Sequence, residues 1–542
     1  MKTAFVACKR NLIWLLHFLT KPITCQPAFF ILLYVLLNML DIYSIAVLHS
    51  YIPLLKSVSG FFFCYILLLP TVILHSIWQK IYKCLLFAFA MFVFVIDLYC
   101  LLLYADTVYT LLPDVAAAVL STNLAETQEF FTTYLEPVKC VVVVITLLFI
   151  NLGFYYIRRI STQWNILSIS VLFVILLFSV VFSLCRLDRI LKTNIFLLFT
   201  KECPDLRQYR QNPDISFLSD SPEKIVLIIG ESFSKSHSSL YGYDKQTNPL
   251  LHKIKEEKSL LLCENTKSYA IATIAAMKSL MSAYTNEMAD SVEWYRCLTL
   301  LEVMQNAGFK TYWCSNQCKS GLWDNEIGRY SDLCDEQFFL SNPDELTSNR
   351  EKSKDNYDGN LIQVLEHYLS SDNSKAFFVL HLMGSHFSYN CRYPGSFSIF
   401  SAKDYATTYP SLSIENRQFV AEYDNSILYN DYVVYEIINR FYEKDAIVIY
   451  LSDHASDIFE SSDDYVGPAK GGIPISEKAG REIPFMVYTS ELFREKHPEL
   501  QRRIENSVSR PYRTDSIMYT IMDVAGVETV NGISYKHKSL FK

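Results

Sequence analysis

Five long apolar runs lie in the first third of this chain and constrain its fold more than any other feature. They cover residues 29–48, 61–78, 85–104, 140–157 and 166–184. Each run approaches the length that an α-helix needs to cross the hydrocarbon core of a bilayer. We therefore expect a transmembrane domain of five helices over residues 1–190, followed by a part that lies outside the membrane.

The placement of Lys and Arg predicts how these helices are oriented. Basic residues precede the first run and lie between the second and third runs and between the fourth and fifth runs. The loop 105–137, in contrast, is acidic. Basic segments next to membrane spans tend to stay in the cytoplasm. Five spans then place everything after residue 184 on the opposite side of the membrane.

Composition narrows the choice of partners. The 542 residues are enough for more than one domain, and the hydrophobic content of 51% fits a membrane part joined to a soluble part. The formal net charge is −7. Nucleic acid is therefore not an expected partner, because phosphate backbones bind to basic surfaces.

The sequence pattern changes after residue 190. Residues 191–221 mix charge and proline with a short apolar stretch, which indicates a connector with an interfacial helix. From residue 222 to 542, short apolar strands alternate with longer segments. Strands are expected at 225–229, 311–314, 376–382, 446–451 and 484–488, and helices at 298–307, 360–369 and 420–441. This alternation favours parallel crossovers and an α/β domain with a mainly parallel central sheet.

Acidic residues and a histidine follow two of the expected strands. Glu231 comes directly after the strand 225–229 and Gly230, and Asp453 and His454 follow the strand 446–451. The carboxyl ends of parallel strands are where open α/β sheets place their ligands. Two carboxylates and an imidazole are a plausible zinc-binding set. Taken alone, an acid after a strand can equally be a helix cap.

Two further segments carry residues suited to phosphate chemistry. Residues 268–281 look like a polar turn that runs into a helix, with Thr273 near the amino end, where backbone N–H groups favour an anion. Coordination to a metal can activate a threonine hydroxyl as a nucleophile. His381 and His386 follow another strand and can hold a metal or a phosphate. The alternatives are a plain helix-terminal threonine and a structural histidine pair.

In combination, these stretches resemble the phosphoethanolamine transferases, a membrane-anchored branch of the alkaline phosphatase and sulfatase superfamily. The order, spacing and residue types all agree with that family. The matching stretches are Gly230-Glu231-Ser232, Tyr241-Gly242-Tyr243, Thr247-Asn248-Pro249, residues 268–282, His381 to His386 with Tyr389 and Arg392-Tyr393-Pro394, residues 423–429, and Ser452-Asp453-His454.

The resemblance implies a periplasmic catalytic domain on a multi-pass anchor in a bacterial inner membrane. It implies zinc held by Glu231, Thr273, Asp453 and His454, with Thr273 as the nucleophile that attacks phosphatidylethanolamine. A covalent threonine intermediate would then pass phosphoethanolamine to an envelope glycolipid of the lipid A or lipopolysaccharide core type. We expect the chain to act as a monomer. The residues that the resemblance assigns to substrate binding are His386, Lys319, His381, Asn316, Asn123 and Glu126.

The chain departs from the family pattern at three places. The family commonly continues Asp-His with Gly-Glu, whereas Ala455 and Ser456 follow here. The stretch 465–472 lacks the usual histidine, which serves the substrate phosphate or a second metal, so one zinc site is expected and a second is in question. Tyr269 and Ser279 stand where many members have a disulfide. The nucleophile loop must therefore be held by packing.

Two other functions remain open at this stage. A phosphoglycerol transferase of the lipoteichoic acid synthase type would share the five spans and the threonine nucleophile. A non-catalytic descendant that binds lipid or a partner protein is the second alternative, because of the missing histidine and the altered Asp-His motif. The mass of the transferred group distinguishes a phosphoglycerol transferase from a phosphoethanolamine transferase. The zinc content of the purified chain distinguishes a non-catalytic descendant from a metal-dependent enzyme.

Overall fold

The structure is a computed structural model, and its described residues fall into two compact units, one before residue 104 and one from residue 205 onward. We describe each unit by itself. The described residues are 18, 20–38, 60–61, 63–103, 205–217, 221–285, 288, 291–317, 319, 327–340, 356–371, 375–460, 466–467 and 477–542.

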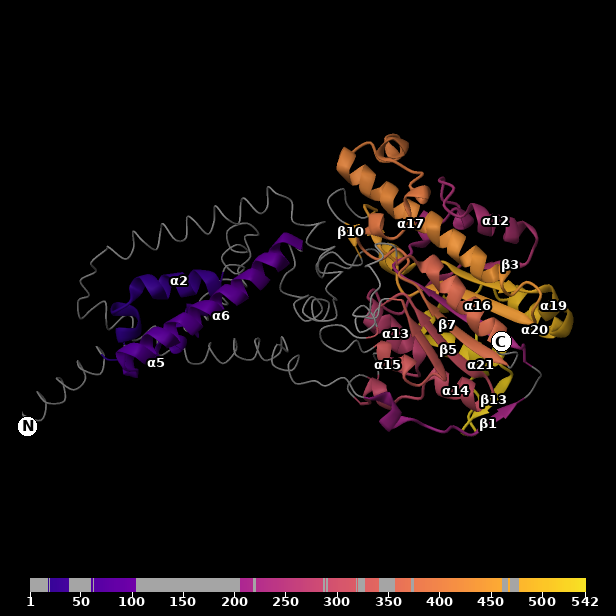
Figure 1. Ribbon diagram of the computed structural model, residues 1–542, viewed down its shortest axis with the longest axis horizontal. Coiled ribbons are helices and arrows are strands. Elements are labelled where there is room, and N and C mark those ends of the chain that lie inside the picture. The colour runs from indigo at the N-terminus through magenta and orange to yellow at the C-terminus, as the bar shows by residue number, and fades with distance from the viewer. Residues whose placement is uncertain are drawn as a thin grey trace, which may run out of the picture. The chain divides into compact units, whose positions relative to one another are not determined.

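The first unit consists of helices that pack on one another (Figure 1). Helices α2 (Pro27–Leu37) and α5 (Pro70–Ile73) each begin with a proline, whose missing N–H costs nothing in the first turn. Helix α6 (Ser76–Leu103) is longer. Buried apolar side chains of α2, such as Leu33, pack with those of α6, such as Ala90.

Among the helices of this described part, none is both long enough and apolar enough to cross a membrane. The runs predicted at 140–157 and 166–184 lie outside the described residues, as do residues 39–48 of the first run. The five-helix transmembrane domain therefore stays a prediction, and so do the boundaries at residues 190 and 221.

The second unit is built around a mixed seven-stranded sheet with the order β3-β11-β8-β2-β7-β5-β6. The strands are β2 (Lys224–Gly230), β3 (Leu260–Cys263), β5 (Lys310–Ser315), β6 (Glu336–Phe339), β7 (Ala376–His381), β8 (Ala446–Ser452) and β11 (Phe485–Thr489). Every residue of the central strands β2, β7 and β8 is buried. Continuous apolar runs are typical of strands that are covered on both faces.

Strands β8, β2, β7, β5 and β6 are parallel, as the sequence predicted for most of the sheet. The strand expected at 484–488 is β11, and the parallel crossover expected for it is wrong, because β11 runs antiparallel to both neighbours. The backbone N–H of Ala455, just after β8, donates to the carbonyl of Gly480, shortly before β11, so both lie at the carboxyl edge.

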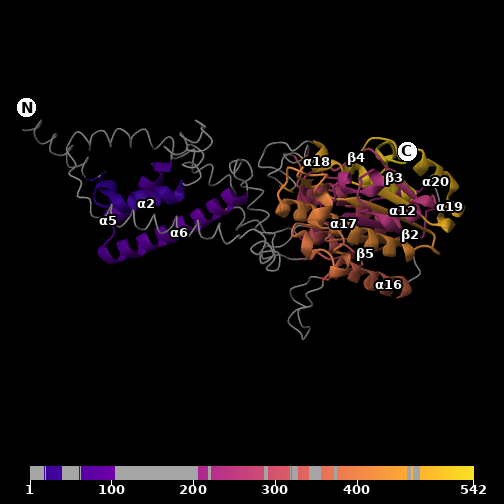
Figure 2. The ribbon, with the colours of Figure 1, turned by 90° about the horizontal axis from the view of Figure 1, so that it is seen from above.

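Helices cover both faces of this sheet (Figures 1 and 2). One face packs against α12 (Pro249–Glu256), α16 (Leu361–Ser371) and α17 (Ile414–Asn439). The other packs against α13 (Thr273–Met281), α14 (Leu300–Asn306), α19 (Glu491–Lys496), α20 (Pro498–Glu505) and α21 (Ile517–Val524). The helices predicted at 298–307, 360–369 and 420–441 correspond to α14, α16 and α17. Helix α17 begins earlier than expected because Ser413 caps it through Asn416 N–H.

Part of the predicted connector packs on this second unit. Strand β1 (Ile215–Phe217) pairs antiparallel with β13 (Val527–Val530), and Leu206 lies in the hydrophobic core beneath. The segment 205–217 therefore brings the chain to the amino edge of β2, from which the strand runs to the carboxyl edge that carries the candidate site.

Candidate active site

The strand register brings the predicted acidic residues together. Gly230 at the end of β2 pairs with Ser452 at the end of β8, so Glu231 and Asp453 leave the sheet side by side. The Asp453 N–H donates to the Gly230 carbonyl at 3.0 Å. Ser232 has a φ of 57°, a left-handed conformation that turns the chain sharply after Glu231. Two strands far apart in sequence thus deliver both carboxylates to one point.

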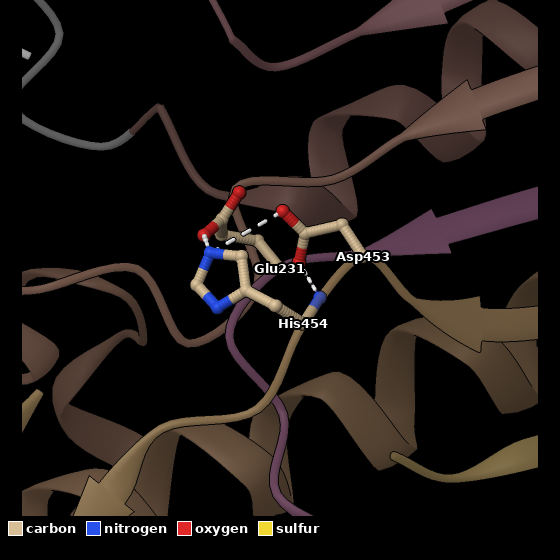
Figure 3. A group of neighbouring side chains, drawn as sticks. All are labelled: Glu231, Asp453 and His454. Carbon is tan, nitrogen blue, oxygen red and sulfur yellow. Dashed lines mark hydrogen bonds and ion pairs between the residues drawn. The ribbon is translucent and has the colours of Figure 1, made fainter. Parts of the chain in front are cut away.

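Glu231, Asp453 and His454 form a compact buried triad (Figure 3). One ligand atom from each lies within 4.8 Å of the others. The His454 Nε2 atom is 3.3 Å from Glu231 Oε1 and 3.5 Å from Asp453 Oδ2. On the other side of the ring, Nδ1 donates to the Ala455 carbonyl at 2.9 Å. The ring is therefore oriented with Nε2 toward the carboxylates.

The electrostatics of this triad favour a bound positive charge. Burial opposes ionisation of Glu231, but its hydrogen bond and charge interaction with His454 outweigh burial and hold the pKa of Glu231 below its usual range. Burial and the nearby charge of Glu231 raise the pKa of Asp453. Burial alone would lower the pKa of His454, but Asp453 and Glu231 raise it to about 10. The carboxylates thus hold a proton on the imidazole, a sign that this pocket requires a cation.

The donor set fits a metal ion. Asp453 Oδ1 accepts from the N–H groups of Ser232 and His454, at 3.1 and 2.6 Å. Asp453 Oδ2 is buried, and no described group donates a hydrogen bond to it. A buried carboxylate oxygen without a donor is costly unless a cation satisfies it. Two carboxylates and one imidazole, with room for a further ligand, are typical of a zinc site that takes part in catalysis.

Thr273 stands at the opening of this triad. Its Oγ1 atom lies 3.2 Å from Glu231 Oε2 and 3.3 Å from His454 Nε2. Thr273 is the first residue of α13, and the preceding residue, Ala272, provides no side-chain cap. The first backbone N–H groups of that helix are therefore directed at the space beside the hydroxyl, where they favour a negatively charged group.

The loop before Thr273 is held by polar contacts. The Tyr269 N–H donates to Thr514 Oγ1 at 2.9 Å, and the Tyr269 carbonyl accepts from the Arg481 guanidinium at 2.7 Å. The Arg513 guanidinium lies over the Tyr269 ring, 5.1 Å from its centroid. The C-terminal segment thus fixes the backbone that leads to the candidate nucleophile.

The loop that carries His386, here called the histidine loop, follows the neighbouring strand β7. His381 is the last residue of β7, and its Nδ1 atom is 3.3 Å from Ser315 Oγ. Burial lowers the pKa of His381 to about 4, so the ring is neutral. The charge of His386 contributes to the low pKa of Glu231. Arg392 donates to the carbonyls of His386 and Phe387, at 3.2 and 3.0 Å, which holds this loop beside the triad.

Other predicted substrate-binding residues have different surroundings. The Asn316 amide donates to Asp358 at 2.9 Å, and Asp358 in turn accepts from the N–H groups of Met383 and Gly384, each at 2.8 Å. Asn316 therefore supports the histidine loop indirectly, by holding Asp358.

The structure does not bring Lys319 to the triad. Its ammonium lies 2.6 Å from Asp332 and 2.7 Å from Gln337 Oε1, beside the edge strand β6. Asn123 and Glu126 lie outside the described residues.

Two residues that contact Glu231 were missed by the sequence reasoning. The Gln317 amide nitrogen donates to Glu231 Oε2 at 3.2 Å and to the Leu382 carbonyl at 3.1 Å. The Ser232 hydroxyl donates to Glu231 Oε1 at 2.7 Å. Gln317 follows β5 by two residues, so the rule that found the acids, a polar residue just past a strand end, would have found it too.

Comparison with known proteins places this architecture among known enzymes. A protein-family model described as Sulfatase matches residues 223–527. A curated relative, phosphoethanolamine transferase EptC of Escherichia coli O18:K1:H7, is 28% identical over 314 residues. That match covers 57% of this chain and 52% of the relative, so the similarity spans about half the length of the relative.

Two solved structures are also similar. The C-terminal periplasmic domain of EptC from Escherichia coli, in complex with zinc, matches with a TM-score of 0.54 and 26% identity over 61% of this chain and 89% of that chain. The integral membrane protein lipooligosaccharide phosphoethanolamine transferase A of Neisseria meningitidis matches with a TM-score of 0.65, covering 95% of this chain and 97% of that chain. Its identity of 18% supports a shared fold alone.

Proposed function

Because the chain belongs to the sulfatase family, we propose that it is a metal-dependent phosphoethanolamine transferase with Thr273 as its nucleophile. One observation carries this proposal: the Thr273 hydroxyl lies 3.2 Å from Glu231 and 3.3 Å from His454, at the amino end of a helix. The similarity to EptC of Escherichia coli supports phosphoethanolamine as the transferred group.

In this proposal one Zn²⁺ is held by Glu231, Asp453, His454 and the Thr273 hydroxyl. The Escherichia coli domain at 26% identity was solved with zinc, which supports this choice of metal. When bound, zinc lowers the pKa of a coordinated hydroxyl and neutralises charge on phosphoryl oxygens. The stretch 465–472, where the family often has a further histidine, contains none, and of this stretch the structure describes residues 466–467. We therefore propose one zinc site.

Thr273 attacks the phosphorus of phosphatidylethanolamine in the first step. A bond forms between Oγ1 and phosphorus, and the bond from phosphorus to the diacylglycerol oxygen breaks. Glu231 accepts the Thr273 hydrogen bond and is the nearest acceptor for its proton. Diacylglycerol leaves with the proton that Glu231 accepted. A hydroxyl or phosphate oxygen of the acceptor then forms a bond to phosphorus, the bond from phosphorus to Oγ1 breaks, and the acceptor's proton passes to Oγ1, which regenerates Thr273.

His381 and His386 are proposed to contact the phosphoryl group. Neutral His381 carries a buried Nε2 atom that no described group contacts through a hydrogen bond, so it can serve a ligand. His386 lies close enough to Glu231 to affect its ionisation. His381 ends strand β7, and His386 is on the following loop, which Asp358 and Arg392 fix, so both can orient a phosphate without a large rearrangement.

A membrane anchor fits the donor lipid. We propose five transmembrane helices in a bacterial inner membrane, with the sulfatase domain in the periplasm, where a monomer would meet phosphatidylethanolamine and an envelope glycolipid. The solved Escherichia coli domain is a periplasmic one, which supports this location. A relative named Kdo(2)-lipid A phosphoethanolamine 7''-transferase, from Escherichia coli, is 25% identical over 334 residues, which supports a glycolipid acceptor.

The proposal is tested by intact mass spectrometry of the purified full chain with zinc and phosphatidylethanolamine. We expect the chain to gain the mass of one phosphoethanolamine group, and Thr273→Ala to gain none, because the Thr273 hydroxyl contacts both Glu231 and His454, whereas the Ser232 hydroxyl donates its hydrogen bond to Glu231. Thr529→Ala is the matched control, since Thr529 is bonded to Ser216 on the separate sheet of β1 and β13. A glycerol phosphate adduct would favour a phosphoglycerol transferase, and absence of both adduct and zinc would favour a lipid-binding descendant.

A further inference from the structure

A cleft lined by basic side chains lies beside the proposed nucleophile loop. Its volume is about 710 Å³, and its lining includes Lys235, Lys267 and Arg513 with a single carboxylate, Glu482. Three cations against one anion stand out in a chain whose formal net charge is −7. None of these residues takes part in the triad described above.

The strand register places this cleft at the same edge of the sheet as the triad. Cys263 at the end of β3 pairs with Phe485 of β11, and Phe485 pairs with Leu451 of β8. Leu451 pairs with Ile229, which precedes Glu231 by two residues. Residues 265–267 and 482 therefore lie just beyond the carboxyl edge, displaced sideways from the triad toward the edge strand β3.

The cleft and the nucleophile loop share one wall. Lys267 directly precedes Ser268, whose hydroxyl bonds to the carbonyl of Asp453 in the triad. Arg513 lies over the ring of Tyr269, four residues before Thr273. A ligand in the cleft would therefore lie next to the chain segment that carries the nucleophile, on the side away from the histidine loop.

The cations are anchored but still face the cleft. The Lys235 ammonium donates to the Glu264 carbonyl at 2.9 Å and lies 3.6 Å from Glu482. Arg513 pairs with Asp515, two residues away. Lys267 is exposed. Such partially neutralised ammonium and guanidinium groups are suited to a strongly acidic group such as a phosphate, which offers several charge-assisted hydrogen bonds.

We propose that this cleft binds the phosphorylated sugar headgroup of the acceptor glycolipid. The proposal rests on the function proposed above, because it assigns the second substrate of that site. The donor phosphoryl group would be held on the side of His381 and His386, and the acceptor on the side of Lys235 and Lys267. The two substrates would then approach Thr273 from opposite sides, which allows the acceptor to wait while the covalent intermediate forms.

The test uses the purified, zinc-loaded full chain with phosphatidylethanolamine as donor and diphosphoryl lipid A as acceptor probe. The variant is Lys235→Gln with Lys267→Gln. We expect the KM for diphosphoryl lipid A to rise about tenfold, because charge-assisted contacts to phosphate are lost. With monophosphoryl lipid A, the increase should be smaller. Added salt should raise the KM of the unaltered chain more than that of the variant.

The matched control replaces two lysines at the opposite edge of the sheet, Lys444→Gln with Lys496→Gln. Lys496 is ion-paired to Glu223, as Lys235 is to Glu482. An unchanged KM in the Lys235 and Lys267 variant, or an increase equal to that of the control, would overturn the proposal. Equal slowing of adduct formation on Thr273 and of transfer would also overturn it, since the lysines would then act on the nucleophile loop.

Failure of the proposed function would be seen separately, as absence of any phosphoethanolamine adduct in the unaltered chain. The cleft is then judged by equilibrium binding of diphosphoryl lipid A to the unaltered chain and to the variant in nanodiscs. About tenfold weaker binding by the variant supports the cleft, and equal binding rules it out.

Discussion

The buried histidine–carboxylate groups around His454 and His237, both in the second unit, differ in that the first has the properties of a metal site and the second does not. In the first, His454 faces Glu231 and Asp453 at 3.3 and 3.5 Å. In the second, His237 Nδ1 lies 2.7 Å from Asp424 Oδ1 between the segment after β2 and helix α17. Both histidines have a raised pKa because of their carboxylate partners, although burial acts against it.

The two groups differ in whether the carboxylate oxygens are already satisfied. Asp424 Oδ1 accepts from His237, and Oδ2 accepts from the hydroxyls of Tyr243 and Tyr405. Asp453 Oδ2 has no described hydrogen-bond donor, and a threonine hydroxyl stands beside the group. Composition therefore does not identify a metal site. What distinguishes the triad from the His237 group is an open acceptor, Asp453 Oδ2, together with a second carboxylate and a neighbouring hydroxyl.

The largest difference between the two groups is expected from removing a charge in the triad. Asp453→Asn should lower transfer by about a thousandfold or more, because stabilisation of the transferring phosphoryl group is lost. Its zinc content should also fall, while the chain stays folded. Transfer assays, metal analysis and thermal unfolding check this. Full zinc content with normal transfer would remove Asp453 from the proposed ligand set.

The corresponding change in the second group should affect stability in place of metal binding. Asp424→Leu should cost about 3–5 kcal/mol of unfolding free energy, because it leaves a buried charge on His237 without its partner. Denaturant unfolding measures this cost, and zinc content should be unchanged. The double variant His237→Leu with Asp424→Leu should recover part of the loss. A loss of zinc in Asp424→Leu would show that the two groups are not independent.

A smaller effect is expected from Gln317, which holds the second oxygen of Glu231. Gln317→Ala should weaken zinc binding about 10- to 100-fold, the usual cost of losing a partner that orients a metal ligand. Competition with a chromogenic chelator measures this affinity. The control is Gln305→Ala, since Gln305 also bridges a side chain and a carbonyl, Thr311 and Leu333, away from the triad. Equal zinc affinity in both variants would assign Gln317 a structural role only.

The smallest effect is a pH dependence that separates the metal-free and zinc-loaded chains. The pKa of His454 is raised to about 10, so its protonation stabilises the folded metal-free chain fully below about pH 6.5. That stability is lost as pH rises toward 10. In the loaded chain His454 is a neutral ligand and contributes no such loss, whereas His237 contributes in both. The melting temperature should therefore fall by a few degrees more without zinc. An equal fall of the melting temperature with pH in the metal-free and zinc-loaded chains would contradict this prediction.

Much of the site could be predicted from sequence because the central strands have a clear pattern. Continuous apolar runs locate β2, β7 and β8, and the polar residues that follow such strands must lie at one edge. Glu231, Asp453 and His454 were found in this way. Thr273 needed the additional signal of a helix start next to a polar turn. Buried strands therefore carry the information that places the candidate metal ligands.

The parts that sequence did not predict depend on contacts between distant segments. Strands β3 and β6 have four residues each and are only partly buried, so their patterns are short and mixed. The antiparallel direction of β11 depends on where the chain travels after β8. Lys319 pairs with Asp332, a choice that local sequence cannot specify. Residue types indicated chemistry, but not which partner each side chain would meet.

The spacing of the triad along the chain has a consequence for biosynthesis. Ser232, next to the first carboxylate, is separated by 221 positions from Asp453, which accepts its N–H. During translation, the three ligand groups cannot meet until the polypeptide beyond residue 454 has emerged and β8 has docked beside β2. In the proposed enzyme, metal loading is then a late maturation event, and a product truncated before β8 would lack the ion.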